Sequence, residues 1–408
     1  MIKIGEFLGK GTYGKVYKIE GRDLAMKQID LNKTGIRELR ELNLLRVINH
    51  PNILHLESFV IGDTYLGMIL PLATNDLKAE AIGGNKVEKW MYQLLSAIHF
   101  LHKNSYFHCD IKPANILLIN GNAILSDLGL TGNITKIGQC QSIASPQLME
   151  SRGIILKNPI AKEKSNEYQD DIWALGVTFY YMLTGSSRIF LIADLLDRYI
   201  SSDQEEFFRG IVDPKYVVLL TRLLKPNPKE RSLNLLELLA LPIFSQYSDY
   251  IEGEIISVKN NKPVIFNEDV IEIFKESIYI LRTAYRLNEN VDSTIKLPII
   301  ILFNSIDMYY RIYETFKDRA SLLCCLYISA KIYGLDFPED MILRVPSIDI
   351  IKAEVEIVKL LDGYLSRDSV MYYIDQSQYD TFLDWIGANP ERYEQCSLAK
   401  LAEITRSL

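Results

Sequence analysis

Apolar and polar positions alternate along three short segments near the start of the chain. These segments are residues 2–9 (IKIGEFLG), 15–20 (KVYKIE) and 24–29 (LAMKQI), and glycines stand in the turns between them. Such alternation places the apolar side chains on one face of a half-buried strand. The pattern therefore predicts strands joined by tight turns in the first part of the chain.

A helical period follows, and then a hairpin. Seven apolar residues share one face of a helix expected over residues 87–101: Val87, Trp90, Met91, Leu94, Leu95, Ile98 and Leu101. In ILLINGNAILSD, Asn120-Gly121 stands between two apolar runs, which is the strongest local signal for a tight β-hairpin. Beyond Asp170 the chain reads as almost wholly helical.

The pattern changes again after about residue 244. SQYSDYIEGE and KNNKP are polar and predict an interdomain linker. From Ile265 onward the chain reads as helical, and residues 294–313 and 318–334 are apolar on more than one face, as in helices buried inside a bundle. Residues 348–365 are amphipathic instead. Their apolar stripe consists of Ile351, Val355, Val358, Leu361 and Leu365. Two domains also agree with a length of 408 residues.

Composition narrows the class of protein. A chain with 48% hydrophobic and 24% charged residues is typical of a soluble globular protein, and a net charge of -7 argues against general nucleic-acid binding. Five cysteines without a Cys-x-x-Cys pair favour a reducing compartment. The histidines lack the spacing of a zinc site. We see no secretory leader, and the apolar runs are shorter than the roughly 18–20 residues of a membrane span. A cytoplasmic or nuclear protein is expected.

Glycines in LGKGTYGKVY, residues 8–17, suggest a phosphate-binding turn. Gly9, Gly11 and Gly14 let backbone amides approach an anion because no side chain intrudes. A P-loop would need Ser or Thr after its Gly-Lys pair, but Val16 follows Lys15. A dinucleotide-binding fold would need a helix after the glycines, whereas the pattern here predicts a strand. A strand–turn–strand lid over phosphates fits, and a merely flexible turn is the alternative.

Two charged residues gain interest only as a pair. Lys27 lies on the strand after the glycine-rich turn, and the helix in GIRELRELNLLRVI carries Glu38 and Glu41. Each alone reads as an ordinary solvated residue. Together, a glutamate can hold a lysine in place on the phosphates of ATP.

The stretch HCDIKPAN, residues 108–115, carries the remaining chemistry. Asn115 directly precedes the hairpin and Asp127 follows it, so antiparallel pairing should bring the two close together. Their amide and carboxylate oxygens are the hard ligands that Mg²⁺ prefers. Asp110 can reach the same place to accept a hydroxyl proton, and Lys112 can neutralise a phosphoryl group. These elements converge on phosphoryl transfer from Mg-ATP to a hydroxyl.

Residues 1–245 resemble a eukaryotic-type protein kinase domain, and most closely the cyclin-dependent kinases. GKGTYGKVYK, LNLLRVINHPNIL and LPLATNDLK carry the closer likeness, DDIWALGV resembles the central helix of the family, and PNPKERSLNLLELLALPIF its closing segment. The resemblance implies an α+β, two-lobed kinase fold. Its small β-rich N-lobe would span about 1–72 and its larger helical C-lobe about 73–245.

The resemblance also assigns roles to residues. It implies that Leu8, Val16, Ala25 and Leu117 sandwich adenine, that Leu70 is the gatekeeper and that Pro71–Ala73 form the hinge. The implied ATP-binding set is Leu8, Gly9, Gly11, Gly14, Val16, Ala25, Lys27, Leu70, Pro71, Leu72, Ala73, Asp76 and Leu117. Alignment on NHPNI selects Glu41 as the partner of Lys27. The catalytic set is then Asp110, Lys112, Lys27 and Glu41, Asn115 and Asp127 hold Mg²⁺, and Lys112 fits a Ser/Thr kinase.

The chain departs from the family pattern at several positions. Cys109 replaces the arginine that usually contacts a phosphorylated activation segment, Cys140 stands where a threonine is usual, and Leu128 replaces phenylalanine. Gln147 replaces a glutamate and can offer Arg231 a hydrogen bond but no charge. We hypothesise a kinase that does not depend on activation-segment phosphorylation. The alternatives are that Cys109 is only a buried filler, or that the whole chain is a catalytically inactive pseudokinase scaffold.

The C-terminal part resembles a cyclin box. IDMYY, SLLCCLYISAKIYG and IIKAEVEIVKLLDGYL resemble its helices two, three and five. This implies an all-α cyclin-like bundle over 264–375, after a linker at 246–263 and before a helical extension at 376–408. Lys331 and Glu354 would dock on the helix that carries Glu41, and Asp307 fits an acidic position of helix two. One alternative is that Lys331 and Glu354 form only an exposed ion pair. Another is that the bundle docks substrates and does not activate the kinase.

Overall fold

The chain forms two compact units. The computed structural model describes residues 3–10, 14–30, 36–62, 65–80, 86–132, 143–231, 233–247, 253–255, 304–305, 308, 319–333 and 350–361. The first unit comprises Met1–Gln28, Ile48–Val60 and Gly67–Ile255. The second comprises Ile29–Val47, Ile61–Leu66 and Ile256–Leu408.

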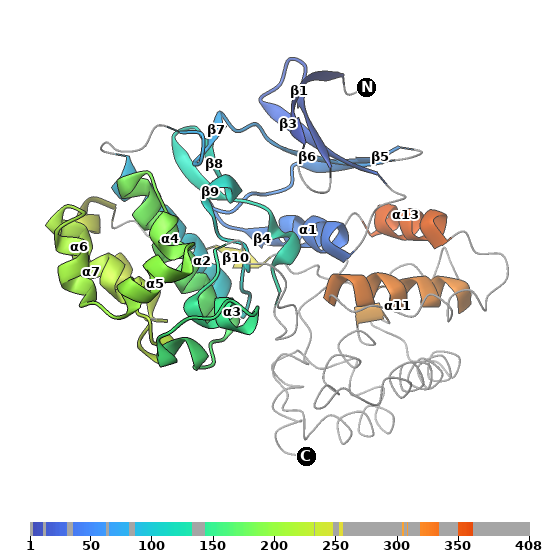
Figure 1. Ribbon diagram of the computed structural model, residues 1–408. Helices are drawn as coiled ribbons and strands as arrows, with labels where there is room; N and C mark the ends of the chain where they lie inside the picture. The colour runs from blue at the N-terminus through green and yellow to red at the C-terminus, as the bar shows by residue number, and fades with distance from the viewer. Residues whose placement is uncertain are drawn as a thin grey trace, which may run out of the picture. The chain divides into compact units, whose positions relative to one another are not determined.

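A five-stranded sheet contains the alternating segments of the N-terminal region (Figure 1). In spatial order its strands are β1 (Ile4–Lys10), β2 (Lys15–Ile19), β3 (Leu24–Asp30), β6 (Tyr65–Pro71) and β5 (Ser58–Ile61). β1 and β3 each pair with β2 in antiparallel fashion, which confirms the strands expected from the alternation. Met26 and Met68 are buried in this sheet, so one of its faces contributes to a core.

Helices follow the N-terminal sheet in the first unit. Its helices are α2 (Val87–Lys103), α3 (Pro146–Ser151), α4 (Glu167–Thr184), α5 (Ala193–Ile200), α6 (Gln204–Arg209), α7 (Pro214–Leu223) and α8 (Leu235–Leu239). Short 3-10 turns occur at Pro113–Asn115, Leu128–Leu130, Pro159–Lys162, Arg188–Phe190, Pro228–Glu230 and Pro242–Tyr247. All seven apolar residues expected on one face of the helix after residue 87 are buried in α2, which confirms that prediction.

The central helix α4 has clear start and stop signals. Asn166 and Gln169 form a capping box at its N-terminus, and Gly185 ends it with a left-handed φ of 77°. Trp173 and Phe190 meet edge to face in the surrounding core, and Phe190 meets Tyr199 in the same way. The helix is therefore fixed at both ends and along its length, which matters because it carries a residue of the candidate site.

A three-stranded sheet supports the candidate site. It consists of β7 (Asn75–Asp76), β8 (Ile116–Ile119) and β9 (Asn122–Leu125), in that order. Asn120 and Gly121 have φ angles of 51° and 74°, the left-handed values that a two-residue hairpin turn requires. Ile116 pairs with Leu125 at the open end of the hairpin, so the predicted hairpin is confirmed together with its register.

The second unit joins a helix from the N-terminal region to helices from the C-terminal region. α1 (Ile36–Val47) and α13 (Ile350–Leu360) both pack against α11 (Arg319–Tyr333) (Figure 1). The helices expected within 318–334 and 348–365 are thus confirmed, and α1 groups with them rather than with the expected lobe at 1–72. Residues 256–303 and 362–408, which include the expected extension at 376–408, lie outside the described residues, as does Asp307.

The expected linker contains a strand. β10 (Glu254–Ile255) pairs in antiparallel fashion with β4 (Ile48–Asn49), which directly follows α1. The polar composition of residues 245–254 concealed this pairing, because a two-residue strand leaves no alternation in the sequence. In the part of the chain that the structure describes, no helix is long and apolar enough to cross a membrane.

Candidate active site

A buried carboxylate on α4 holds the loop that contains HCDIKPAN. Asp171 is 0% exposed, and its two oxygens accept the backbone N–H groups of His108 at 2.7 Å and Cys109 at 2.9 Å. His102 Nε2 lies 3.2 Å from the same carboxylate. Sequence reasoning had given Asp171 no role. The apolar run that directly follows Asp171 in α4 was the available signal, because a charge that adjoins such a run is buried with it and needs partners.

Cys109 has a strained backbone and a packed side chain. Its φ of 66° lies in the left-handed region, which costs free energy for any residue except glycine, and the hydrogen bond to Asp171 offsets that cost. Its side chain is 4% exposed and clusters with Phe107 and Leu130, against which Tyr168 packs. A thiol in this cluster offers no cation to a phosphate, which fits both readings of Cys109.

Three of the expected catalytic and metal-binding residues meet at one carboxylate. Asp110 is 6% exposed. Lys112 Nζ donates to Asp110 Oδ2 at 2.6 Å, and Asn115 Nδ2 donates to the same oxygen at 3.0 Å and to the Asp110 carbonyl at 2.8 Å. Since Asn115 uses its nitrogen for these contacts, its side-chain oxygen is the atom that would face a metal. The two donors also fix the plane of the Asp110 carboxylate.

The hairpin returns the chain to Asn115, as its spacing predicts. Ser126 donates both its backbone N–H and its Oγ to the Asn115 carbonyl, each at 2.9 Å. His108 Nε2 lies 3.0 Å from the Ser126 carbonyl, while Asp110 N donates to His108 Nδ1. Asp127 comes next, with left-handed backbone angles of 61° and 65°. The residues at both ends of the hairpin are therefore tied to the loop that bears Asp110.

The donor set at the hairpin suits magnesium better than a transition metal. Asn115 and Asp127 offer an amide oxygen and a carboxylate. Among the described residues, no group of three or more His, Cys, Asp or Glu side chains could hold a metal ion by itself. Magnesium commonly binds through one or two such side chains together with phosphates and water, so this pair fits Mg²⁺ held jointly with a nucleotide.

Most of the described residues expected around ATP lie on strands of two sheets in the first unit. Val16 pairs with Gly9 on one side and with Lys27 on the other. Asp76 pairs with Leu117, and Leu72 N donates to Asp23 O in the segment after β6. The remaining positions differ in exposure: Ala25 and Leu70 are buried, Leu8 is exposed, and Gly14, Pro71 and Ala73 are half-buried. Gly11 lies outside the described residues.

Lys27 and Glu41 belong to different units, and their pairing stays a prediction. Lys27 lies on β3 in the first unit. Glu41 lies on α1 in the second unit and is 4% exposed. This burial excludes the alternative that Glu41 is an ordinary solvated residue. The side chain of Glu38 lies outside the described residues.

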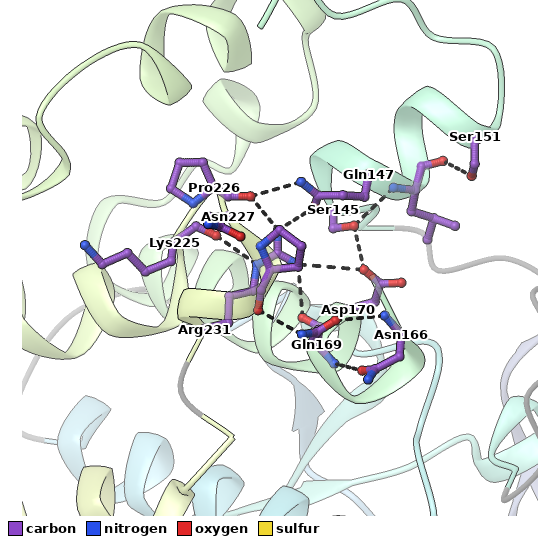
Figure 2. A network of polar contacts seen from close by, with 12 residues as sticks. Ser145, Gln147, Ser151, Asn166, Gln169, Asp170, Lys225, Pro226, Asn227 and Arg231 are labelled. Carbon is purple, nitrogen blue, oxygen red and sulfur yellow. Dashed lines mark hydrogen bonds and ion pairs between the residues drawn. The ribbon is translucent and has the colours of Figure 1, made fainter. Parts of the chain in front are cut away.

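A buried polar network surrounds Arg231 and confirms the contact expected from Gln147 (Figure 2). Gln147 Oε1 accepts from Arg231 at 2.5 Å, while its Nε2 donates to the carbonyls of Ile160 at 2.9 Å and Pro226 at 3.0 Å. Asp170 lies 3.8 Å from Arg231 and accepts from Ser145 Oγ at 2.6 Å. Burial lowers the pKa of Arg231 to about 10 and raises that of Asp170. An amide suits this position because it both accepts and donates.

We expect the Gln147→Glu variant to be less stable than the original chain. A carboxylate would gain an ion pair with Arg231 but would place its second oxygen against two carbonyl oxygens that now accept hydrogen bonds. Both carbonyls keep another donor, Glu163 N for Ile160 and Arg231 Nη2 for Pro226, so the cost comes from the new carboxylate oxygen, which would lie buried against two acceptors without a donor. An unpaired buried acceptor of this kind costs about 1–3 kcal/mol, which outweighs the gain because Asp170 already faces Arg231. Thermal unfolding measures the change, and Gln147→Met separates the lost bonds from the added charge. An unchanged or higher melting temperature for Gln147→Glu would contradict this account.

The fold and this arrangement define a class of protein. The family model described as the protein kinase domain matches residues 2–243, more than half of the chain. Together with the β-rich N-terminal sheet and the helical part that follows, this match shows that the chain belongs to the protein kinase family.

Several curated proteins are similar to this chain. A probable cell division protein kinase of Encephalitozoon cuniculi is 31% identical over 194 residues, which are 44% of this chain and 71% of that protein. CBL-interacting serine/threonine-protein kinase 20 of Arabidopsis thaliana is 27% identical over 56% of this chain and 55% of its own length. Cell division control protein 2 homolog 3 of Trypanosoma brucei brucei is 37% identical over 31% of this chain and 45% of its own. The chain thus spans about half the length of the latter two relatives.

Proposed function

We propose that this protein is a Ser/Thr protein kinase that transfers the γ-phosphate of ATP to hydroxyl groups of protein substrates. The convergence of Lys112 and Asn115 on one oxygen of Asp110 carries the proposal. The likeness to cell division and serine/threonine-protein kinases supports it. Asp110 orients the substrate hydroxyl and accepts its proton, Lys112 neutralises the phosphoryl group in transit, and Lys27 grips ATP.

Magnesium would be held by Asn115 and Asp127, and when bound it would neutralise charge on the ATP phosphates. The hydrogen bonds around Asn115 and Asp127 support their role as magnesium ligands. Ser126, the residue before Asp127, donates to the Asn115 carbonyl, and the Asn115 amide nitrogen donates to Asp110. The side chain of Asn115 is therefore oriented by the same bonds that orient the proposed base.

Transfer of labelled γ-phosphate to a generic protein substrate tests the proposal, with Asp127→Asn as the matched variant. This substitution keeps the size of the side chain and removes the charge that would bind the metal. The proposal expects transfer by the original chain and not by the variant. Nucleotide binding without transfer by the original chain would favour a pseudokinase scaffold, the reading suggested by Cys109 and Gln147.

The C-terminal region is the proposed intramolecular activator of the kinase. Within the second unit, Arg40 of α1 is 3% exposed, and its Nε donates to the carbonyl of Ile332 on α11 at 2.7 Å. Ile332 directly follows Lys331, where the cyclin likeness places a docking residue. The side chains of Lys331 and Glu354 lie outside the described residues. Packing of α11 on α1 supports the proposal that this region orients the helix carrying Glu41.

Activation without phosphorylation is the second part of this proposal. The resemblance to protein kinases implies that Arg40, beside Glu41, is the one phosphate-binding arginine of the family that remains in this chain. Its Nε donates to the Ile332 carbonyl of α11, and Cys109 cannot replace a phosphate-binding arginine. Thr131 is completely buried, whereas Thr135, Cys140 and Ser142 lie outside the described residues.

Simultaneous replacement of Thr131, Thr135 and Ser142 with alanine should therefore change the rate of phosphoryl transfer by less than about threefold, because less than ~1 kcal/mol would be lost. Initial rates of the variant and of the original chain, both purified without phosphatase inhibitors, provide the measurement. Loss of activity in the triple variant would show that a phosphate on the activation segment is required.

A further inference from the structure

Residues Gly253–Ile255 are fitted closely to the first unit. Strand β10 lies beside β4 (Figure 1). Glu254 pairs with Asn49 and Ile255 with Ile48, and Asn49 Nδ2 donates to the Glu254 side chain at 2.9 Å. Ile48 is buried. This short ribbon lies within the first unit and joins two segments that are about two hundred residues apart in sequence.

Gly253 lies against a wall that has no room for a side chain. A Cβ at this position would lie 2.7 Å from Asn49 O, 2.8 Å from His50 Cδ2 and 2.8 Å from Phe100 Cε2. Burial lowers the pKa of His50 to about 4, so its ring is neutral at physiological pH, and the ring lies 5.1 Å from that of Phe100. Residue 253 can approach the backbone of β4 this closely only because it is a glycine.

Two of the five points at which the chain passes from one unit to the other lie at this ribbon. α1 ends at Val47, the last residue of its segment in the second unit, and Ile48 begins the next segment of the first unit. Ile255 is the last residue of the first unit before the C-terminal region begins at Ile256. Ile48 and Ile255 are direct partners in the ribbon, so the C-terminal region starts beside the end of α1.

The geometry points to Gly253–Ile255 as an anchor strand that makes the C-terminal region act on α1 of its own chain. A covalent tether raises the effective concentration of a docking segment to about the millimolar range when the length of the tether matches the span between the two sites. Binding of the anchor strand to β4 thus favours packing of α11 on α1 within one molecule. This inference rests on the proposed activating role of the C-terminal region and names the device that enforces it.

Replacing Gly253 with valine in the full-length protein tests the anchor strand. The branched side chain would collide with Asn49 O and with the rings of His50 and Phe100, which would displace β10 from β4. Amide hydrogen exchange in α1 should then become faster by about tenfold or more, because α11 would cover α1 less often. Gly210→Ala is the matched control, since a Cβ there would meet nothing within 4 Å.

A milder double variant, Asn49→Ala with Glu254→Ala, removes the side-chain bond of the ribbon without a collision. It should accelerate exchange in β4 and α1 in the same direction while the melting temperature of the protein stays within a few degrees. Unchanged exchange of α1 in both the valine and the double variant would overturn the anchor. Because exchange is measured without ATP or substrate, this outcome differs from failure of the proposed function, in which the original chain transfers no phosphate.

Discussion

Asp110→Asn should lower the rate of phosphoryl transfer by about 10²- to 10⁴-fold while leaving the affinity for ATP nearly unchanged. Asparagine has the same shape and can still accept from Lys112, but it cannot take a proton from a substrate hydroxyl. Asn115 and Lys112 now fix the Asp110 carboxylate through Oδ2. The loss should therefore appear in kcat and not in the binding of nucleotide. Steady-state rates and calorimetric titration with ATP measure the two quantities separately.

A second aspartate provides the control for this variant. Asp203 is the N-cap of α6, where its side chain accepts from Glu206 N at 2.8 Å. Asparagine and aspartate are similarly good N-caps, so Asp203→Asn should leave both the rate and the fold unchanged. An Asp110→Asn protein with more than about a tenth of the original rate would contradict the role of Asp110 as a base.

Arg40→Met should lower the rate of phosphoryl transfer by about 5- to 150-fold. Methionine fills similar space, but it leaves the buried Ile332 carbonyl without the donor that lies 2.7 Å away, at a cost of about 1–3 kcal/mol. If α11 holds α1 in its active orientation, this cost reduces the fraction of active molecules. Initial rates at saturating ATP, together with hydrogen exchange in α1, provide the measurement.

Two controls separate the role of Arg40 in packing α11 on α1 from other effects of removing an arginine. Arg209→Met on α6 removes an arginine that pairs with exposed Glu205, and it should be silent. Phosphatase treatment of the original chain should also be silent, because Arg40 serves α11 in this account and not an activation-segment phosphate. If phosphatase treatment lowered the rate as much as Arg40→Met does, Arg40 would instead be a phosphate ligand.

Local patterns were sufficient to predict many of the strands and helices and the hairpin beside the candidate site. The Asn120-Gly121 turn fixes the register of β8 and β9, and that register alone brings the residues after Leu125 back to Asn115. The apolar face of α2 follows from its 3.6-residue period. The bond between Gln147 and Arg231 was predicted instead from the resemblance to protein kinases, since no local pattern joins residues 84 positions apart.

Other features of the fold and of the candidate site depend on contacts between segments that are distant in sequence, and no local pattern predicts them. Asp171 meets the backbone of Cys109 from 62 positions away, and the left-handed backbone of Cys109 depends on such a partner. Read alone, Glu41 is an ordinary charged residue of a helix, and its burial depends on what packs on that helix. The anchor strand is two paired residues within a polar stretch, too short for a period to emerge.

The most direct measurement is the initial rate of γ-phosphate transfer by the phosphatase-treated full-length protein, with Asp110→Asn and Asp127→Asn purified in parallel. The account predicts that the original chain places label on serine or threonine of the substrate and that both variants lose nearly all of this transfer. Label of equal intensity in all three samples, or no label in any of them, would contradict the central claim that these side chains form a working phosphotransferase site.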